Sequence, residues 1–317
     1  MESAALFTLG SSSGLRLSYL AEGAANIVYQ IVHPPASPST EADLGFPVDQ
    51  ADGALPATPP PTEISPLAID PRLEGKLIRL RKDLSTTVPV TESWDHFQNV
   101  VIPLFLGSQL VSQTLFKISP EFVKTLNTEL RCMEDDGRRS QRRHGVYVDE
   151  NEGYGTLVSN MSSDEWSMSI EFKPKWLLQS PNAPEGSKRC RTCALRAMHQ
   201  ARSQGTRSGD NKNGFCPLSL VSGDRSKVSG VVEQLLGSSK FSDIDRMWLG
   251  DQLIKWFPQS PLLQRLKQLQ RDLDPNGVLQ ANLQSQNFLT AMTIRDCTLF
   301  LKVDLPSFHR LQADFMY

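Results

Sequence analysis

The strand region from Tyr154 to Trp176, and above all its second half from Trp166, constrains the fold more than any other part of the chain. Its apolar side chains alternate with polar ones at Trp166, Met168, Ile170 and Phe172. A period of two is the pattern of a β-strand that buries one face and exposes the other. We therefore predict a strand here whose apolar face packs on a core.

The polar face of this predicted strand carries Glu171, Lys173 and Lys175. Because an unpaired ammonium is costly to bury, two lysines on one face indicate either an edge strand with a solvated face or a cleft that binds an anion. Pro174 lacks the N–H that a sheet hydrogen bond needs, so regular pairing should end near it. Both interpretations of the lysines are open at this point.

The overall composition limits the possible partners. At 317 residues the chain is long enough for two lobes with separate cores, since cores commonly divide above roughly 250 residues. A net charge of −2 creates no strong field, so we expect no nucleic-acid binding, and a phosphate-rich ligand would need a local cluster of Lys and Arg. The longest apolar runs, Val100–Leu106 and Thr298–Val303, are far shorter than the roughly 20 residues of a membrane-spanning helix, so no membrane partner is expected.

The cysteines and the N-terminal sequence indicate in which cellular compartment the protein works. The chain has 5 cysteines, an odd number spread over its length, which favours reduced thiols over a disulfide framework. Met1–Ser13 contains Glu2 but no Lys or Arg, unlike a secretory signal. We expect a monomer in the nucleus, the cytoplasm or both.

A loop of small residues lies between two alternating segments near the N-terminus. Leu15–Leu20 and Ile27–Val32 flank the sequence Glu-Gly-Ala-Ala-Asn at 22–26, which predicts a strand, a loop and a strand. Such a loop lets backbone N–H groups approach phosphate oxygens, as in kinases that cover ATP with a glycine-containing loop. Alone, it could equally be a hairpin turn.

A basic strand is predicted at Gly75–Lys82, where Arg79 and Arg81 share one face. In this order, loop and then basic strand, Arg79 would be the cation that meets nucleotide phosphates. Residues 34–72 before it are rich in Pro, Ser and Thr, and are predicted to form a disordered insertion.

Several helices follow from periodicity and end signals. Within Trp94–Val111 we predict a helix that stops at Pro103, followed by a short apolar turn that ends at Gly107. A second helix should run from Ser119-Pro120-Glu121 to about Cys132. The polar run Asp135–His144 is expected to be a solvated loop. Further helices are predicted at Cys193–Arg202, Ser226–Leu236, Asp243–Phe257 and from Pro261, the last with core leucines at 262, 266, 269 and 273.

Asp296 stands in a predicted polar turn between the apolar segment Phe288–Ile294 and a buried strand at Thr298–Val303. A carboxylate there could accept a hydroxyl proton or bind Mg²⁺. A lone aspartate in a turn can also be purely structural.

Cys190 and Cys193 have the two-residue gap of half a zinc site, which Cys216 or His199 could complete. The alternative is that these cysteines are free thiols.

Six short motifs occur in the order typical of one family, the inositol-pentakisphosphate 2-kinases of the fungal type. The most specific is E-x-K-P-K, at Glu171–Lys175. The others are residues 22–28, 75–79, 100–107, 216–223 and 295–298. The chain thus resembles kinases that transfer phosphate from ATP to the 2-hydroxyl of inositol 1,3,4,5,6-pentakisphosphate and produce inositol hexakisphosphate (phytate).

The resemblance implies an α+β, two-lobed kinase-like fold. An N-lobe at 1–165 would have an antiparallel sheet with helices, and a larger C-lobe of mixed α/β structure at 166–317 would carry the substrate and catalytic residues. It also implies ATP and Mg²⁺ as cofactors, inositol pentakisphosphate as partner, and a role for each matching residue. The nucleotide would be bound by Gly23, Ala25, Asn26, Arg79 and Glu171. Lys173 and Lys175 would bind substrate phosphates, and Asp296 would orient or deprotonate the attacking hydroxyl.

The second acidic motif of that family, D-L-D-x-K, has only a partial match at Asp304-Leu305, so the chain looks shortened at its C-terminus and Asp304 is the candidate magnesium ligand. This leaves an alternative, a catalytically impaired pseudokinase that still binds inositol polyphosphates. A further alternative is a zinc-stabilised interaction domain.

Overall fold

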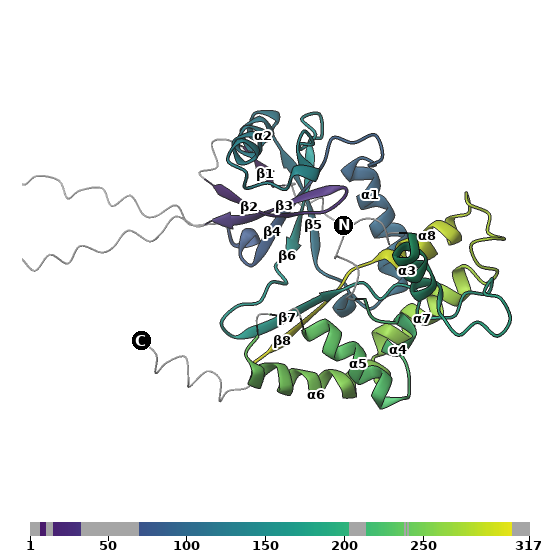
Figure 1. The fold of residues 1–317 in the computed structure, drawn as a ribbon. Coiled ribbons are helices and arrows are strands. Elements are labelled where there is room, and N and C mark those ends of the chain that lie inside the picture. Colours follow the sequence, from purple (N-terminus) through teal and green to yellow (C-terminus); the bar gives the residue numbers. More distant parts are fainter. Residues whose placement is uncertain are drawn as a thin grey trace, which may run out of the picture. The chain divides into compact units, whose positions relative to one another are not determined.

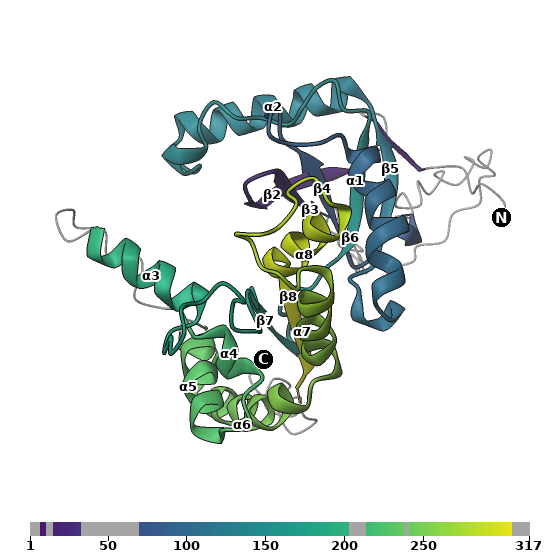
Figure 2. The same ribbon diagram turned by 90° about the vertical axis from the view of Figure 1, so that its right-hand side faces the viewer.

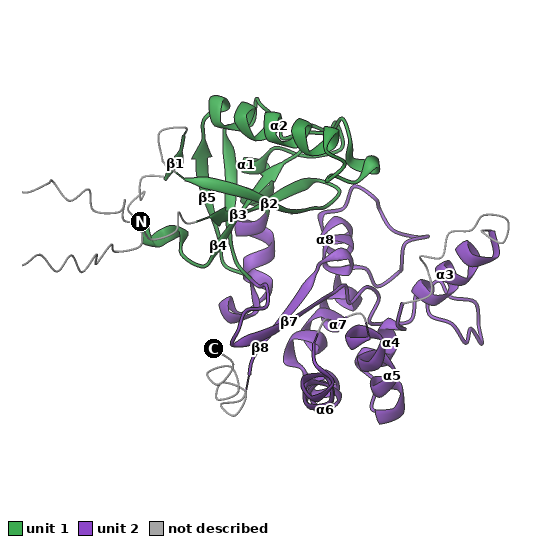
Figure 3. Cartoon of the chain, turned by 60° about the vertical axis from the view of Figure 1, so that its left-hand side comes forward, with its two compact units in different colours: residues 1–96, 111–160 green, residues 97–110, 161–317 purple. Residues whose placement is uncertain are grey.

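The computed structural model describes residues 7–10, 15–32, 70–202, 214–237, 239 and 241–305. The chain forms two compact units, each with its own hydrophobic core (Figure 3). Unit 1 comprises residues 1–96 and 111–160, and unit 2 comprises 97–110 and 161–317. Both units mix helices and strands, which confirms the predicted α+β class with two lobes.

Unit 1 is built on a six-stranded sheet of order β1-β5-β6-β4-β3-β2 (Figure 1). All neighbours are antiparallel except β1 and β5, which are parallel. The strands are β1 (Thr8–Leu9), β2 (Arg16–Glu22), β3 (Asn26–Val32), β4 (Lys76–Arg81), β5 (Gln113–Ile118) and β6 (Tyr154–Ser159).

The alternation seen in the sequence explains why one face of this sheet is buried. In β3 the side chains of Ile27, Tyr29 and Ile31 are buried, and the residues between them are not. Helix α2 (Pro120–Asp135) covers that face with apolar residues such as Phe122 and Leu126. Its N-cap is Ser119, whose hydroxyl accepts a hydrogen bond from the Phe122 N–H at 3.2 Å, so the predicted start of the helix is confirmed.

Some boundaries in the first half of the chain differ from the prediction. Helix α1 spans Val90–His96, beginning before Trp94, and continues as a π-helical segment over Phe97–Val101. Most of the predicted insertion at 34–72 lies outside the described residues, but Pro71–Leu73 form a 3-10 turn whose Leu73 is buried in the core of unit 1.

Unit 2 places a two-stranded antiparallel ribbon among helices. The ribbon pairs β7 (Ser167–Phe172) with β8 (Leu299–Asp304). The helices are α3 (Arg191–Arg202), α4 (Pro217–Leu220), α5 (Arg225–Leu236), α6 (Asp243–Gln259), α7 (Pro261–Leu273) and α8 (Gln286–Asp296). Helices α7 and α8 lie side by side (Figure 2).

The core of unit 2 forms where the apolar face of β7 meets these helices. Phe172 stacks edge-on against Phe257 of α6, with ring centroids 5.7 Å apart. Leu266 and Leu269 of α7 are buried as predicted, whereas Leu262 and Leu273, at the two ends of the helix, are only partly buried and Leu263 is fully buried. None of the helices in the described ranges is long and apolar enough to cross a membrane.

Candidate active site

The loop between β2 and β3 is held by the end of β4. The Gly23 N–H donates to the Asn26 carbonyl at 2.9 Å, which closes the turn. Lys82, directly after β4, donates from its backbone N–H to the Ala25 carbonyl and from its ammonium to the Gly23 carbonyl, both at 2.9 Å. The predicted strand, loop and strand are therefore confirmed, and the loop is fixed at both ends.

Beneath this loop lies a buried ion-pair network centred on Glu22. Its carboxylate pairs with the Lys82 ammonium and accepts two hydrogen bonds from the Arg139 guanidinium at 2.9 and 3.0 Å. Burial alone would raise the pKa of Glu22, but the hydrogen bonds from Arg139 and Lys82 lower it to about 2. Glu22 is therefore ionised at neutral pH and fixes both cations under the loop.

The prediction that Asp135–His144 is a solvated loop is wrong at Arg139, which is buried. Besides Glu22, Arg139 pairs with Glu134 and donates to the Val146 carbonyl at 2.6 Å. Two carboxylates thus balance the charge of the Arg139 guanidinium, and this pairing allows the arginine to be buried. Arg139 is therefore a buried residue within a run whose polar composition predicts exposure throughout.

Arg79 and Arg81 share a face of β4 as predicted, but their partners differ. Arg81 pairs with two carboxylates, those of Asp149 and Glu152. Arg79 is half-buried and donates to the neutral amide oxygen of Gln113 at 2.7 Å, and burial lowers its pKa. Within the described ranges no carboxylate pairs with Arg79, so its charge is available to an anionic ligand.

In unit 2, Lys173, Lys175 and Asp296 come together in a solvent-accessible cluster. The Lys173 ammonium lies 3.1 Å from Asp296 Oδ2, and the Lys175 ammonium contacts Oδ1. A hydrogen bond from Lys175 is the main cause that lowers the pKa of Asp296, burial opposes it, and Lys173 adds to the lowering. The arrangement is one carboxylate held between two ammonium groups that can also reach an external anion.

The local backbone of this cluster differs from the predicted strand. Strand β7 ends at Phe172, so Lys173 and Lys175 lie in the loop that follows, as the position of Pro174 suggested. Met168, Ile170 and Phe172 are buried as predicted, but Trp166 is 41% exposed because it lies before the first paired residue of β7.

Asp296 is the last residue of α8 rather than part of a turn between apolar segments. The apolar stretch before it is this helix, and the strand after it, β8, is buried on one face only. The carboxylate is therefore presented by a helix end, directly before the ribbon.

Two other predicted residues are not brought into this cluster. Asp304 is at the opposite end of the ribbon, paired with Ser167, whereas Asp296 lies just before the Leu299 end. Asp304 lies five residue steps along the strand from Leu299, or about 16 Å. Glu171 is exposed on β7, and it belongs to unit 2, whereas Gly23, Ala25, Asn26 and Arg79 belong to unit 1.

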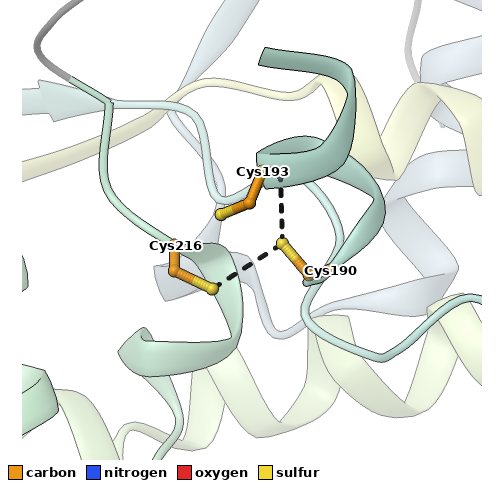
Figure 4. A group of neighbouring side chains, drawn as sticks. All are labelled: Cys190, Cys193 and Cys216. Carbon is orange, nitrogen blue, oxygen red and sulfur yellow. Dashed lines mark hydrogen bonds between the residues drawn. The ribbon is translucent and has the colours of Figure 1, made fainter. Parts of the chain in front are cut away.

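Cys190, Cys193 and Cys216 form a cluster in which the three sulfur atoms lie within 4.8 Å of one another (Figure 4). The Cys190 and Cys216 sulfurs are 3.6 Å apart, too far for a disulfide but close to the roughly 3.8 Å between thiolates on a tetrahedral zinc. Arg196 of α3 holds the two segments together by donating to the Phe215 carbonyl at 3.1 Å. His199 is exposed and is not a member of the cluster, so Cys216 is the third residue.

The thiols of this cluster differ in acidity. Burial, together with Cys190 and Cys216, raises the pKa of Cys193 to about 12. Burial also opposes ionisation of Cys216, but hydrogen bonds from the Leu218 N–H and from the neighbouring thiols lower its pKa. Cys216 is thus the most readily ionised of the thiols with a resolved shift, and a metal ion would favour ionisation of all three.

Comparisons with known proteins identify the family. A family model described as inositol-pentakisphosphate 2-kinase matches residues 19–314. A protein of Yarrowia lipolytica (strain CLIB 122 / E 150) named inositol-pentakisphosphate 2-kinase is 36% identical over 233 residues, which cover 72% of this chain and 73% of that protein. The family-model match, over residues 19–314, includes parts of both units and the residues discussed above from Gly23 to Asp304. The chain therefore belongs to the inositol-pentakisphosphate 2-kinase family.

Proposed function

We propose that this protein is an ATP-dependent kinase that phosphorylates the 2-hydroxyl of inositol pentakisphosphate, giving inositol hexakisphosphate and ADP. The observation that carries the proposal is the convergence of Lys173 and Lys175 on Asp296, in the most specific motif of the family. Phosphoryl transfer depends mainly on positioning and on neutralising charge, and this cluster offers both.

The two lysines would bind substrate phosphates. Their side chains are 44% and 39% exposed, so both ammonium groups can turn toward a ligand without the cost of leaving a buried pair. A pentakisphosphate carries far more negative charge than one carboxylate and would compete effectively for them.

Asp296 would accept the proton of the attacking hydroxyl. While both lysines hold it, its lowered pKa makes it a weak base. When substrate phosphates draw the lysines away, the cause of that lowering is removed and the nearby negative charge raises the pKa further. Asp296 would thus become a better base only after the substrate is bound.

The β2–β3 loop and Arg79 would bind the ATP phosphates. Gly23 has nothing within 4 Å of the position of a Cβ, so a ligand can approach its backbone closely. Arg79 would supply a cation that pairs with no carboxylate among the residues the structure describes, and Glu171, exposed on β7, would be a further nucleotide contact.

Magnesium would arrive with ATP, because Mg²⁺ is usually held by substrate phosphates and only one or two carboxylates. The residues described here do not assemble a carboxylate cluster for it, and Asp304 lies away from Asp296. We therefore assign no step to a protein-bound magnesium.

A structural zinc ion would fit the cysteine cluster. The Cys190–Cys216 sulfur separation suits a tetrahedral site, and Cys193, whose sulfur lies within 4.8 Å of both, would be the third ligand. Zinc there would tie α3 to the start of α4. We also propose that the protein acts as a monomer in the nucleus or cytoplasm.

The test is a turnover assay of the purified 317-residue chain with ATP and inositol pentakisphosphate, with products identified by ³¹P NMR. We expect one ADP for each inositol hexakisphosphate. Asp296→Ala should abolish turnover while leaving the substrate bound. A chain that binds the substrate but never consumes ATP would contradict the proposal and support the pseudokinase alternative.

A further inference from the structure

Gln270 of α7 is a buried polar residue that contacts the loop after β7, which carries Lys173 and Lys175. It is 1% exposed. Its side-chain amide nitrogen donates to the Lys175 carbonyl at 2.7 Å, and its amide oxygen accepts from the Leu177 N–H at 2.9 Å. One side chain therefore satisfies both backbone groups that flank Trp176, and we call this pair of hydrogen bonds the Gln270 bridge.

The backbone that the bridge holds is in a conformation that a lysine rarely adopts. Lys175 has a φ of 53°, and it is the one non-glycine residue with positive φ in the described part of the chain. Such a conformation persists only where the surroundings hold it. The bridge fixes the peptide groups on the C-terminal side of Lys175, and so fixes the direction in which the lysine side chain leaves the loop.

The same bridge is connected to the helix that carries Asp296. Arg295, 4% exposed, donates to the Gln270 carbonyl at 3.2 Å and to Asp274 at 2.6 Å. Its guanidinium also lies 3.7 Å from the centre of the Trp176 ring. Gln270 therefore contacts the segment of Lys175 through its side chain and the helix end of Asp296 through its backbone.

We infer that Gln270 is a positioning residue for phosphoryl transfer, which sets the Lys175 ammonium at the distance from Asp296 that substrate binding requires. It does not touch the reacting groups and acts through Lys175. The inference rests on the proposed function, because the consequence of misplacing Lys175 is weaker binding of inositol pentakisphosphate.

Gln270→Met tests this with little change in volume. The variant removes both hydrogen bonds of the bridge and should raise the KM for inositol pentakisphosphate roughly tenfold, because part of the binding energy of the substrate must then order the Lys175 segment. The KM for ATP should stay unchanged. Gln268→Met is the matched control, since Gln268 is exposed on the same helix, and it should change neither KM.

A merely structural role predicts a different pattern. General destabilisation reduces the amount of active enzyme, which lowers the apparent kcat and leaves both KM values unchanged. That pattern, or an equal rise in the two KM values, would overturn the inference.

Gln270→Glu provides a second variant with a pH readout. A carboxylate can accept from the Leu177 N–H but cannot donate to the Lys175 carbonyl, so the KM for inositol pentakisphosphate should exceed the wild-type value at pH 8. Protonation restores a donor, so the ratio of variant to wild-type KM should fall as the pH is lowered to 6. An unchanged KM at pH 8 would contradict the role of the bridge.

Hydrogen exchange separates failure of this inference from failure of the proposed function. In Gln270→Met the Leu177 amide should exchange faster than in wild type, while amides in the middle of α7 keep their protection. If the wild-type chain does not phosphorylate inositol pentakisphosphate, the proposed function fails and the exchange result still reports on the bridge. An unchanged Leu177 exchange rate would show that the bridge does not hold the loop.

Discussion

Glu22→Gln should destabilise unit 1 by about 3 kcal/mol at neutral pH. The side chains of Glu22, Lys82 and Arg139 are 3%, 1% and 0% exposed, and a glutamine cannot balance the charge of Lys82. Removing one partner of a buried ion pair costs about 3–5 kcal/mol, because the other charge is left uncompensated. The lowering of the Glu22 pKa from 4.5 to about 2, which has the same ion pairs as its cause, corresponds to about 3 kcal/mol as well.

The same pKa gives the loss of stability a definite pH dependence. Because the pKa is lower in the folded protein than in the unfolded chain, the stabilisation is complete above pH 4.5 and is lost as the pH falls toward 2. The difference in stability between wild type and Glu22→Gln should therefore shrink over that interval, since the variant has no carboxyl to protonate at this position.

Hydrogen exchange of the β3 and β4 amides measures this effect in unit 1 itself, which matters because a chain of two units need not unfold in one step. Asp136→Asn is the control, since the Asp136–Arg138 pair is exposed at 57% and 60% and should contribute less than about 1 kcal/mol. The reasoning is refuted if Glu22→Gln costs no more than the control, or if its cost is the same at pH 3 and pH 7.

Four further outcomes are expected. Asp296→Asn should abolish turnover with little change in thermal stability, because its ion pairs with the lysines are solvent-accessible; a large fall in melting temperature would contradict this. Lys175→Ala removes the main cause that lowers the pKa of Asp296 in the free enzyme, so the acid limb of the kcat/KM profile should move to higher pH, and an unmoved limb would argue against Asp296 as the base. Gly155→Ala should cost about 1–3 kcal/mol in urea unfolding, since a Cβ would lie 2.5 Å from Phe116 Cζ in the core of unit 1; an unchanged midpoint would mean that the core can relax. Elemental analysis should find one zinc per chain and none in Cys190→Ser, and a wild-type chain without zinc would leave the cluster as free thiols.

Sequence periodicity was sufficient for the elements that bury one face. The alternation of Ile27 to Val32 and of Met168 to Phe172 places these strands, and the leucine spacing after Pro261 places α7. Strands β1 and β5 were missed, because Thr8–Leu9 is too short to show a period and Gln113–Ile118 carries no clear alternation. Their pairing depends on the tertiary structure.

The site was predictable only where its residues are neighbours in sequence. The two-residue spacing of Lys173 and Lys175 indicated that both could reach the same group, and the structure shows that the group is Asp296. The buried Arg139 could not be recognised within a polar run, because its partner Glu22 is 117 residues away. The role of Gln270 could not be predicted for the same reason, because the two residues that it hydrogen-bonds are more than 90 positions away in the sequence.

The most direct test of the mechanism is the ionisation of Asp296 itself, followed by ¹³C NMR of its carboxyl group with and without inositol hexakisphosphate. In the free protein its pKa should lie below the usual 3.8, because Lys175 and Lys173 hold the carboxylate. Binding of the polyphosphate should raise that pKa, as the phosphates draw the lysines away. A pKa that is the same with and without a saturating amount of the ligand would contradict the claim that Lys173, Lys175 and Asp296 form the substrate site.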